Sequence, residues 1–259
     1  MAERVQKILA HWGIASRRSA EKMILAGRVT LNGAPVQLGD RADPVIDKLC
    51  VDGKQVQPNQ RPKHHYYLIH KPKGVVSTCK DPRDRRTVLT LLPKELQQGQ
   101  GMHPIGRLDA QSTGALLLTN DGELTLALTH PRYHVSKRYR VWLRGIVPKQ
   151  PLEQWRQGVM VEGRKTQPAT ITLKKVDRNQ TCVDIILTEG KNRQIRRIAE
   201  QLGYPVVSLH RFAIGNIKLD NLQRGHARPL TNKEIRHLQQ HIHSQPSHHS
   251  PVPHREHSA

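Results

Sequence analysis

The hydrophobic pattern at the start of the chain predicts two helices followed by two hairpins. Residues 5–12 place apolar side chains at the i, i+3, i+4 and i+7 spacing of one helical face. A second helix is expected over residues 16–27, where a serine can cap the start and a glycine the end. Asn32-Gly33 and Asp52-Gly53 are typical of two-residue hairpin turns. The pattern therefore predicts a small α/β-hairpin domain over residues 1–62.

Strand-like segments dominate the rest of the chain, after a proline-containing linker at residues 58–63. The expected strands cover residues 66–70, 75–78, 115–118, 137–143, 169–173, 181–187, 206–209 and 214–219. The expected helical segments cover residues 88–92, 123–128, 152–158, 194–203 and a last helix after the capping box 231–234. Because no β-α-β alternation recurs, we expect an α+β fold with a mixed, mostly antiparallel sheet over residues 63–240. Residues 241–259 are mostly His, Ser and Pro, which predicts a disordered tail.

The segment 137–143 alternates between two kinds of side chain, as a strand with one buried face does. Its apolar face carries Tyr139, Val141 and Leu143, and its opposite face carries Arg138, Arg140 and Trp142. A tyrosine is thereby placed on the inner side of a basic strand.

The helix expected over residues 194–203 separates its arginines by position. Its apolar stripe is made by Ile195, Ile198, Ala199 and Leu202. At about 100° per residue, Arg193 and Arg197 lie opposite this stripe, where they can be solvated charges or phosphate ligands. Arg196 lies at the edge of the stripe, so it should be partly desolvated and need a carboxylate nearby.

The charge balance indicates a polyanionic partner. The 42 Lys and Arg against 21 Asp and Glu give a formal net charge of +21, spread through the predicted folded segments. Nucleic acid is the usual partner of such a chain, and an unspecific basic character is the simpler alternative. With three Trp, five Tyr and one Phe, rows of stacked aromatic residues are not expected. Contacts from Arg and Lys to phosphates should therefore dominate.

Cysteine use and hydropathy bound the cellular setting. Cys50, Cys79 and Cys182 are far apart and odd in number, which argues against a disulfide framework or zinc ribbon and indicates a reducing, cytoplasmic setting. The sequence shows no secretory segment or long apolar run, so no membrane association is expected. The histidines of the tail match no defined ligand spacing, so no metal site is predicted.

Few catalytic motifs are compatible with the sequence. It contains no Gly-rich nucleotide loop, no catalytic zinc spacing and no Gly-x-Ser-x-Gly motif, so no cofactor is expected. Asp109 stands out because it lies on a polar loop between the apolar pieces 105–108 and 115–118. Such a carboxylate is either a turn residue that binds its own backbone or a group with a catalytic task. We expect Gly114, on the same loop, to leave room for a nucleotide.

The N-terminal segment resembles the S4 RNA-binding domain. The matching stretches are Val5-Gln-Lys-Ile-Leu-Ala, Ala15-Ser-Arg-Arg-Ser-Ala-Glu-Lys-Met-Ile and Gly27-Arg-Val-Thr-Leu-Asn-Gly. The resemblance implies that the second helix and the adjoining hairpin present their basic side to structured RNA. The cations concerned are Arg17, Arg18, Lys22 and Arg28. Since the helix dipole disfavours cations in the first turn, an external phosphate explains Arg17 and Arg18 better than a solvated helix end.

The second domain resembles the RsuA/RluB class of rRNA pseudouridine synthases. Four stretches carry the resemblance, in the order of the class: His70-Lys-Pro-Lys-Gly-Val-Val-Ser, Gly106-Arg-Leu-Asp with Ser112-Thr-Gly-Ala-Leu-Leu-Leu-Thr-Asn-Asp-Gly-Glu-Leu, Lys137-Arg-Tyr-Arg-Val, and Glu189-Gly-Lys-Asn-Arg-Gln-Ile-Arg-Arg. The resemblance extends to about residue 238 and implies a catalytic domain of the pseudouridine synthase type.

The same resemblance implies roles for individual residues. Asp109 would be the catalytic aspartate, Tyr139 would stack on the flipped uracil, and Arg196 would pair with Asp109. Further contacts to the substrate or the RNA backbone are expected from Arg107, Lys191, Lys71, Lys73, Arg193 and Arg197. Isomerisation of uridine involves no redox change, which agrees with the expectation of no cofactor.

The substrate implied by the resemblance is ribosomal RNA, acted on by a monomer in the cytoplasm. The segment His130-Pro-Arg-Tyr-His-Val-Ser-Lys favours large-subunit (23S) over small-subunit (16S) rRNA. Two other functions stay open at this point. One is a non-catalytic RNA-binding or ribosome-assembly factor, and the other is an RNA enzyme of another type, such as a methyltransferase, for which no cofactor loop is found.

Overall fold

Two short helices and a small sheet form the N-terminal domain. The computed structural model describes residues 2–56, 63–130 and 133–243. The helices α1 (Val5–His11) and α2 (Arg17–Leu25) lie where the apolar spacing predicts them. The hydroxyl of Ser16 accepts a hydrogen bond from the Ser19 N–H at 3.2 Å, which makes Ser16 the predicted N-cap of α2.

Both predicted hairpin turns are formed in this domain. Asn32 and Asp52 adopt left-handed φ angles of 52° and 50°, and a glycine follows each, as such turns require. The antiparallel sheet has the order β3-β2-β5-β6, and β1 pairs separately with β4. These strands are β1 (Glu3–Arg4), β2 (Val29–Leu31), β3 (Ala34–Pro35), β4 (Arg41–Ala42), β5 (Leu49–Val51) and β6 (Lys54–Gln55). The predicted boundary at residue 62 falls outside the described residues.

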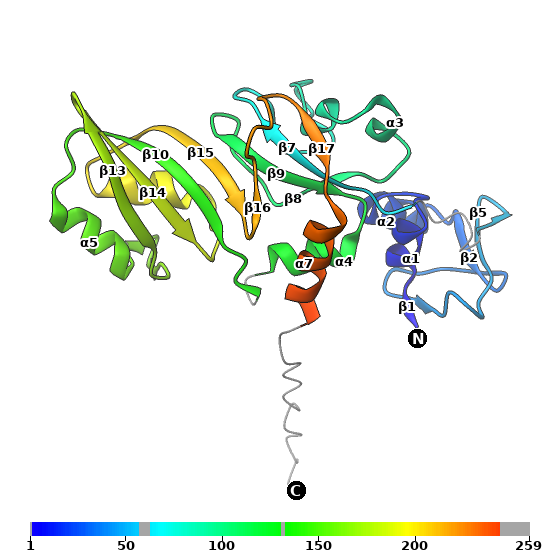
Figure 1. The fold of residues 1–259 in the computed structure, drawn as a ribbon. Helices are drawn as coiled ribbons and strands as arrows, with labels where there is room; N and C mark the ends of the chain where they lie inside the picture. Colours follow the sequence, from blue (N-terminus) through cyan, green and yellow to red (C-terminus); the bar gives the residue numbers. More distant parts are fainter. Residues whose placement is uncertain (1, 57–62, 131–132, 244–259) are drawn as a thin grey trace, which may run out of the picture.

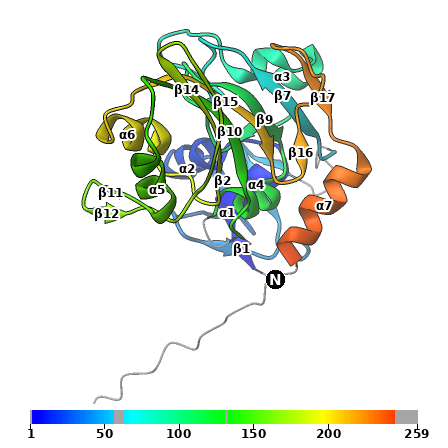
Figure 2. The same cartoon turned by 60° about the vertical axis from the view of Figure 1, so that its left-hand side comes forward.

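A nine-stranded sheet organises the second domain (Figures 1 and 2). Its main order is β13-β14-β10-β15-β9-β7-β17, with β16 paired to β15 and β8 to β9. Its strands are β7 (Tyr66–Lys71), β8 (His103–Ile105), β9 (Thr113–Thr119), β10 (Lys137–Arg144), β13 (Thr170–Asp177), β14 (Gln180–Leu187), β15 (Val206–Ile214), β16 (Ile217–Lys218) and β17 (Ala227–Pro229). All pairings of these strands are antiparallel except that of β15 with β9. The predicted mixed, mostly antiparallel sheet is therefore confirmed.

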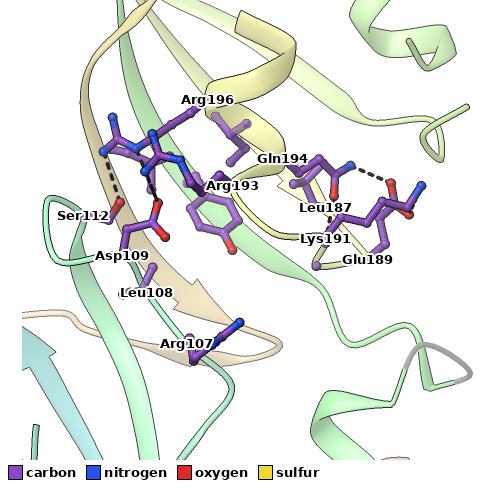
Figure 3. Close-up of a pocket in the computed structure, with 14 residues that line it drawn as sticks. Arg107, Leu108, Asp109, Ser112, Leu187, Glu189, Lys191, Arg193, Gln194 and Arg196 are labelled. Carbon is purple, nitrogen blue, oxygen red and sulfur yellow. Dashed lines mark hydrogen bonds and ion pairs between the residues drawn. The ribbon is translucent and has the colours of Figure 1, made fainter. Parts of the chain in front are cut away.

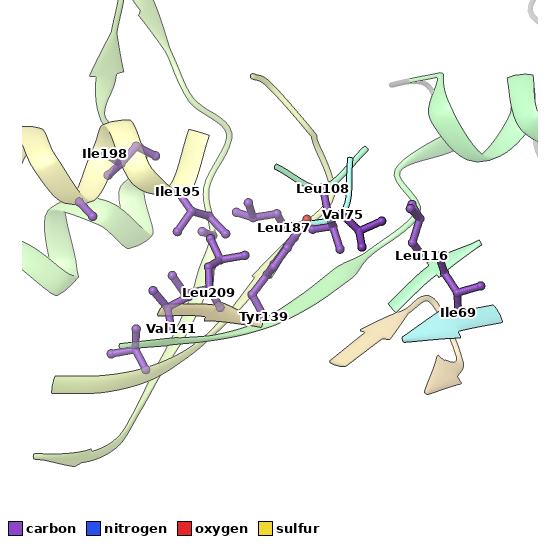
Figure 4. Close-up of a cluster of buried hydrophobic side chains, with 14 of the residues drawn as sticks. Ile69, Val75, Leu108, Leu116, Tyr139, Val141, Leu187, Ile195, Ile198 and Leu209 are labelled. Atoms are coloured by element: carbon purple, nitrogen blue, oxygen red, sulfur yellow. The ribbon is translucent and has the colours of Figure 1, made fainter. Parts of the chain in front are cut away.

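Helices cover this sheet unevenly. They are η2 (Val88–Leu91), α3 (Lys94–Gln97), α4 (Gly122–Thr129), α5 (Lys149–Gln157), α6 (Gln194–Gln201) and α7 (Asn232–His243), and a small hairpin is formed by β11 (Met160–Val161) and β12 (Arg164–Lys165). Residues from α5 and α6 join the larger hydrophobic core on one face (Figure 4). Residues from α4 and α7 form a second core on the opposite face of β7 and β9. Among the described residues, no helix is long and apolar enough to span a membrane.

The two halves of the sheet meet at a very close backbone contact. The parallel pairing of β15 with β9 joins His210 to Thr113 and Arg211 to Gly114. A Cβ atom built on Gly114 would lie 2.1 Å from the carbonyl oxygen of Arg211, and the φ of Gly114 is +117°. The space beside Gly114 is thus filled by β15. The expectation that this glycine makes room for a nucleotide is wrong.

Two further predictions differ from the structure in detail. Residues 75–78 form no strand, because Val76 makes only an isolated parallel bridge to Thr87. α7 continues to His243, three residues into the segment predicted to be a disordered tail. Residues 244–259 lie outside the described residues. The predicted capping box of α7 is present, since Glu234 N–H donates to the Thr231 hydroxyl at 3.2 Å and Thr231 N–H donates to Glu234 Oε2 at 2.8 Å.

Candidate active site

A pocket opens where the loop before β9 meets β10, the end of β14 and the start of α6 (Figure 3). Its lining comes from segments that are far apart in the sequence. The lining residues are Arg107, Leu108, Asp109, Ser112, Tyr139, Leu187, Glu189, Gly190, Lys191, Arg193, Gln194, Ile195, Arg196 and Leu209. Asp109, Tyr139 and Arg196 are therefore in one cavity, as are Arg107, Lys191 and Arg193.

Two guanidinium groups face the carboxylate of Asp109. Its Oδ2 lies 3.4 Å from Arg193 Nη1 and 3.6 Å from Arg196 Nε. One third of the Asp109 side chain is exposed, so the carboxylate can be reached from the pocket opening. The arrangement gives a single carboxylate, held by opposite charges and open to a ligand on its free side.

Arg196 is the more buried of the two arginines. Its side chain is 14% exposed, against 49% for Arg193. Its Nη2 donates to the Ser112 hydroxyl at 3.2 Å, so Arg196 contacts both Asp109 and the end of the loop that carries it. Burial lowers the pKa of Arg196, and the negative charge of Asp109 opposes that shift. Arg196 thus lies half-buried beside a carboxylate, in the setting that the apolar stripe of its helix predicts.

Arg193 occupies a less common backbone conformation. It precedes α6 with a left-handed φ of 51°, which non-glycine residues adopt rarely. This conformation ends the preceding loop and begins the helix while the side chain reaches Asp109. The helical wheel placed Arg193 opposite the apolar stripe, where it could be a solvated charge or a phosphate ligand. It could not show the approach to Asp109.

Tyr139 forms an apolar wall of the pocket. Its side chain is buried, with 8% of the residue exposed, and it packs in the larger core with Leu187 and Leu209 (Figure 4). Arg211 Nη1 donates to the Tyr139 hydroxyl at 3.4 Å, and the guanidinium carbon lies 5.9 Å from the ring centroid. The buried guanidinium of Arg211 therefore holds the Tyr139 ring in its orientation.

Arg211 is a residue that the sequence reasoning missed. It is 5% exposed, its Nε donates to the Ala115 carbonyl at 2.7 Å, and its Nη2 is buried without a hydrogen-bond partner. It thus links Tyr139 on one half of the sheet to β9 on the other. A signal was available, because Leu209 and Arg211 are two residues apart in a strand and therefore share its inner face.

Lys71 was predicted to contact RNA, and the structure contradicts this. The residue has no exposed surface, so it cannot reach a phosphate. Its ammonium group donates instead to the carbonyl oxygens of Pro72, Asp109, Ala110 and Ser112, at 3.1, 3.1, 3.4 and 2.9 Å. Burial lowers the pKa of Lys71 to about 8. Lys71 is a structural support of the loop that carries Asp109.

Ser77 supports the same loop from its other end. Its hydroxyl donates to the Leu108 carbonyl at 2.8 Å and accepts the Leu108 N–H at 3.1 Å. Together with Lys71, it fixes the backbone on both sides of Asp109. The position of the carboxylate is therefore set by residues more than thirty positions away in the sequence.

The other predicted cations lie at or beyond the pocket rim. Arg107 and Lys191 are exposed lining residues, and Lys191 Nζ lies 3.4 Å from Glu189 Oε2. Lys73 is exposed in the turn after β7 and does not line the pocket. Arg197 pairs with Glu162 beside the β11–β12 hairpin and lies outside the pocket lining.

In the N-terminal domain, the four predicted RNA contacts are all exposed. Arg17, Arg18 and Lys22 lie along α2, and Arg28 follows it. Arg28 makes a bidentate pair with Asp52, at 2.8 and 2.6 Å, which partly neutralises it. The described residues contain no group of three or more His, Cys, Asp or Glu side chains able to hold a metal ion.

Comparisons with known proteins match both parts of the chain. Residues 65–201 fit the sequence profile of the family described as RNA pseudouridylate synthase, and residues 3–44 fit that of the S4 domain. Ribosomal large subunit pseudouridine synthase B of Bacillus subtilis (strain 168) is 38% identical over 239 residues, which is 91% of this chain and 95% of that protein. An uncharacterized RNA pseudouridine synthase of Aquifex aeolicus (strain VF5) is 36% identical over 92% of this chain and 94% of its own length. A crystal structure of a pseudouridylate synthase aligns with a TM-score of 0.64 and 29% identity, covering 91% of this chain and 99% of that one.

Proposed function

Because the chain belongs to the RNA pseudouridylate synthase family and carries an S4 domain, we propose that it converts one uridine of large-subunit rRNA to pseudouridine, with Asp109 as the catalytic residue. The family assignment confirms the resemblance read from the sequence, including the fold type and the enzyme class. It also argues against both alternatives, an RNA enzyme of another type such as a methyltransferase and a non-catalytic RNA-binding or ribosome-assembly factor. The observation that carries the catalytic assignment is the Asp109 carboxylate, held by Arg193 and Arg196 at the opening of the pocket.

The reaction requires little more than protein side chains that are held in position around the uridine. The N1–C1′ glycosidic bond of uridine breaks, a C5–C1′ bond forms, and the proton on C5 is replaced while N1 gains one, so atoms and electrons balance without an external reagent. A base must leave its stack before these atoms can be reached. The buried ring of Tyr139 offers a face for that base, and Asp109 lies across the same pocket. Arg107 and Lys191 are exposed at the rim and would hold flanking phosphates.

The S4 domain would supply a second grip on the RNA. Arg17, Arg18 and Lys22 are exposed on α2, where the first two lie in the helix's first turn. A bound phosphate would offset the unfavourable interaction of these two cations with the helix dipole. The large-subunit assignment rests on the similarity to the Bacillus subtilis protein, which is named for the large subunit. Action as a monomer in the cytoplasm stays a prediction.

A tritium-release assay tests both parts of the proposal. Unmodified large-subunit and small-subunit rRNA transcripts, labelled at C5 of uridine, are incubated with the full chain and with the variant Asp109→Asn. We expect release from the large-subunit transcript only, and a loss of roughly a hundredfold or more in the variant. Glu153→Gln, an exposed carboxylate on α5, is the matched control and should retain full activity. Release from the small-subunit transcript alone would overturn the substrate, and an active Asp109→Asn would overturn the catalytic residue.

A further inference from the structure

Half of the large sheet has one face that the helices do not cover. The strands β13, β14, β10 and β15 bury their inner face against the core that includes α5 and α6. Figure 1 shows α6 behind these strands, with no described helix drawn in front of them. On this outer face, which lies opposite the pocket, Thr170, Thr172, Arg140 and Arg144 are exposed. This is the arrangement that the alternation of residues 137–143 predicts, with Tyr139 and Val141 inside.

The central strand of this outer face is strongly basic. Along β10 it presents Arg138, Arg140, Trp142 and Arg144. Alternate residues of a strand lie about 6.6 Å apart. That spacing is comparable to the distance between successive phosphates of an extended single RNA strand. A row of cations at this interval suits a single-stranded backbone that follows β10.

Two of the few aromatic residues of the chain lie on the same face. Trp142 is partly exposed on β10, and Lys175 Nζ lies 5.0 Å from the centroid of its ring. Phe212 is partly exposed on the neighbouring β15, and the guanidinium of Arg140 lies 5.7 Å from its ring centroid. An aromatic residue with an adjacent cation is a common platform for a base and its phosphate.

The cations of this outer face are only partly neutralised. Arg140 pairs with Asp184 at 2.8 Å, and Lys175 lies 3.4 Å from Asp177. No ion pair is found for Arg138 or Arg144 within the part of the chain that the structure describes. The Nε of Arg138 is buried without a hydrogen-bond partner. Because no described carboxylate neutralises Arg138 or Arg144, the positive charge of this face favours an external anion.

We propose that the outer face of β13-β14-β10-β15 binds a single-stranded segment of RNA, separate from the segment in the pocket. An antiparallel four-stranded sheet with aromatic and basic side chains on an open face is a known physical solution for binding unpaired bases. Stacking on Trp142 and Phe212 would hold bases, and Arg138 and Arg144 would hold phosphates. The inference goes beyond the isomerisation, since it requires no uridine and no contact with Asp109.

Tryptophan fluorescence can report on this face directly. Trp12 and Trp155 are 6% and 1% exposed, so Trp142 is the accessible tryptophan of the chain. The probe is an oligoriboadenylate of about 12 nucleotides, which contains no substrate uridine. We expect it to quench the emission of the full chain as it binds. Trp142→Phe should abolish the quench but keep most of the affinity measured by anisotropy, because a phenyl ring still stacks.

Matched variants separate this face from the rest of the basic surface. Trp142→Ala should weaken oligoadenylate binding by roughly fivefold to a hundredfold, as loss of one stacked base does. Lys175→Glu, on the outer face, should weaken oligoadenylate binding more than Lys149→Glu does. Lys149 is an exposed lysine of α5 on the opposite side of the same sheet. Asp109→Asn should leave the binding unchanged, so the outcome is independent of the catalytic assignment. An unquenched emission at saturating RNA, or equal effects of the two lysine variants, would overturn the proposal and leave this face to a protein partner or to solvent.

Discussion

The ammonium nitrogen of Lys71 lies 3.1 Å from the backbone carbonyl oxygen of Asp109, although the two residues are 38 positions apart. The same ammonium group donates to three further carbonyl oxygens of Pro72, Ala110 and Ser112. A charged group with four carbonyl partners and no solvent contact gives the loop one conformation. The carboxylate of Asp109 is thereby held in front of Arg193 and Arg196.

Replacing Lys71 by methionine should therefore disturb the loop that carries Asp109 while leaving the pocket-lining residues unchanged. Methionine fills much of the same volume but leaves several buried carbonyl groups unsatisfied, at about 1–3 kcal/mol for such a group. We expect Lys71→Met to lower the free energy of unfolding by about 2–3 kcal/mol in urea titrations and to lower kcat more than it raises KM. Lys73→Met, two residues further on and exposed, should change neither the free energy of unfolding nor kcat, because loss of an RNA contact at Lys73 would change KM alone. Equal effects of the two variants would show that Lys71 has no special role in the loop.

The lowered pKa of Lys71 gives a pH dependence of defined sign. Its pKa is about 8 in the folded chain, against 10.5 as the ordinary value. Between these values the unfolded chain binds the proton and the folded chain releases it, so stability rises with pH across this window. The difference in unfolding free energy between the wild type and Lys71→Met should grow by about 3 kcal/mol from pH 8 to 10.5. A difference that stays constant or falls over this range would contradict the assignment.

Gly114 should be intolerant of any side chain, because of its neighbour and not because of a substrate. Its Cβ would lie 2.1 Å from the Arg211 carbonyl oxygen and 2.6 Å from the Arg211 nitrogen. Gly114→Ala must therefore push apart the two halves of the sheet, and we expect a loss of at least about 3 kcal/mol of stability. Gly163→Ala is the control, since Gly163 also has a positive φ but no atom within 4 Å of its Cβ. It should lose only about 1 kcal/mol. Thermal or urea unfolding of both variants measures the contrast, and similar losses would disprove the steric explanation.

Gly114 and Lys71 are two positions for which local sequence patterns led to a wrong prediction. The period of two in a strand is fixed by backbone geometry, so the inner position of Tyr139 and the outer position of Arg140 were correctly predicted. The partner of Gly114 is Arg211, nearly a hundred positions away, and no local pattern indicates which strand passes so close. The loop glycine was therefore wrongly assigned to the substrate.

Lys71 was predicted to be exposed and is buried. A lysine beside a turn is exposed in most proteins, and the turn signal Lys71-Pro-Lys-Gly74 suggested a basic loop for RNA. In the structure Lys71 lies two residues after Ile69 on the same face of β7, and burial of a lysine is costly without partners. Those partners are the carbonyl oxygens of another loop, which only the folded structure brings within reach.

Tyr139 should separate the contributions of its ring and its hydroxyl. Tyr139→Phe keeps the ring and removes the acceptor of the Arg211 Nη1 hydrogen bond at 3.4 Å. If the ring's main task is to stack on the base, this variant should keep more activity than Tyr139→Ala, which loses a stacking contribution of roughly 1–3 kcal/mol. Single-turnover tritium release from the rRNA transcript measures both. Equal loss in the two variants would show that the hydroxyl is the essential group.

The two arginines beside Asp109 should differ in their importance. Arg196 is largely buried and binds both Asp109 and Ser112, whereas Arg193 is half-exposed and makes one contact at 3.4 Å. Arg196→Ala should therefore lower kcat by roughly tenfold to a hundredfold, because it frees both the carboxylate and the loop end.

The neighbouring Arg197 supplies a matched control for this prediction. It follows Arg196 directly on α6, but it pairs with Glu162 outside the pocket lining. Arg197→Ala should leave kcat unchanged, and Arg193→Ala should fall between the two. Addition of guanidinium ion to Arg196→Ala should restore part of the rate, because a small cation can occupy the space beside Asp109. An Arg196→Ala variant as active as Arg197→Ala would show that the ion pair with Asp109 is not needed for the reaction.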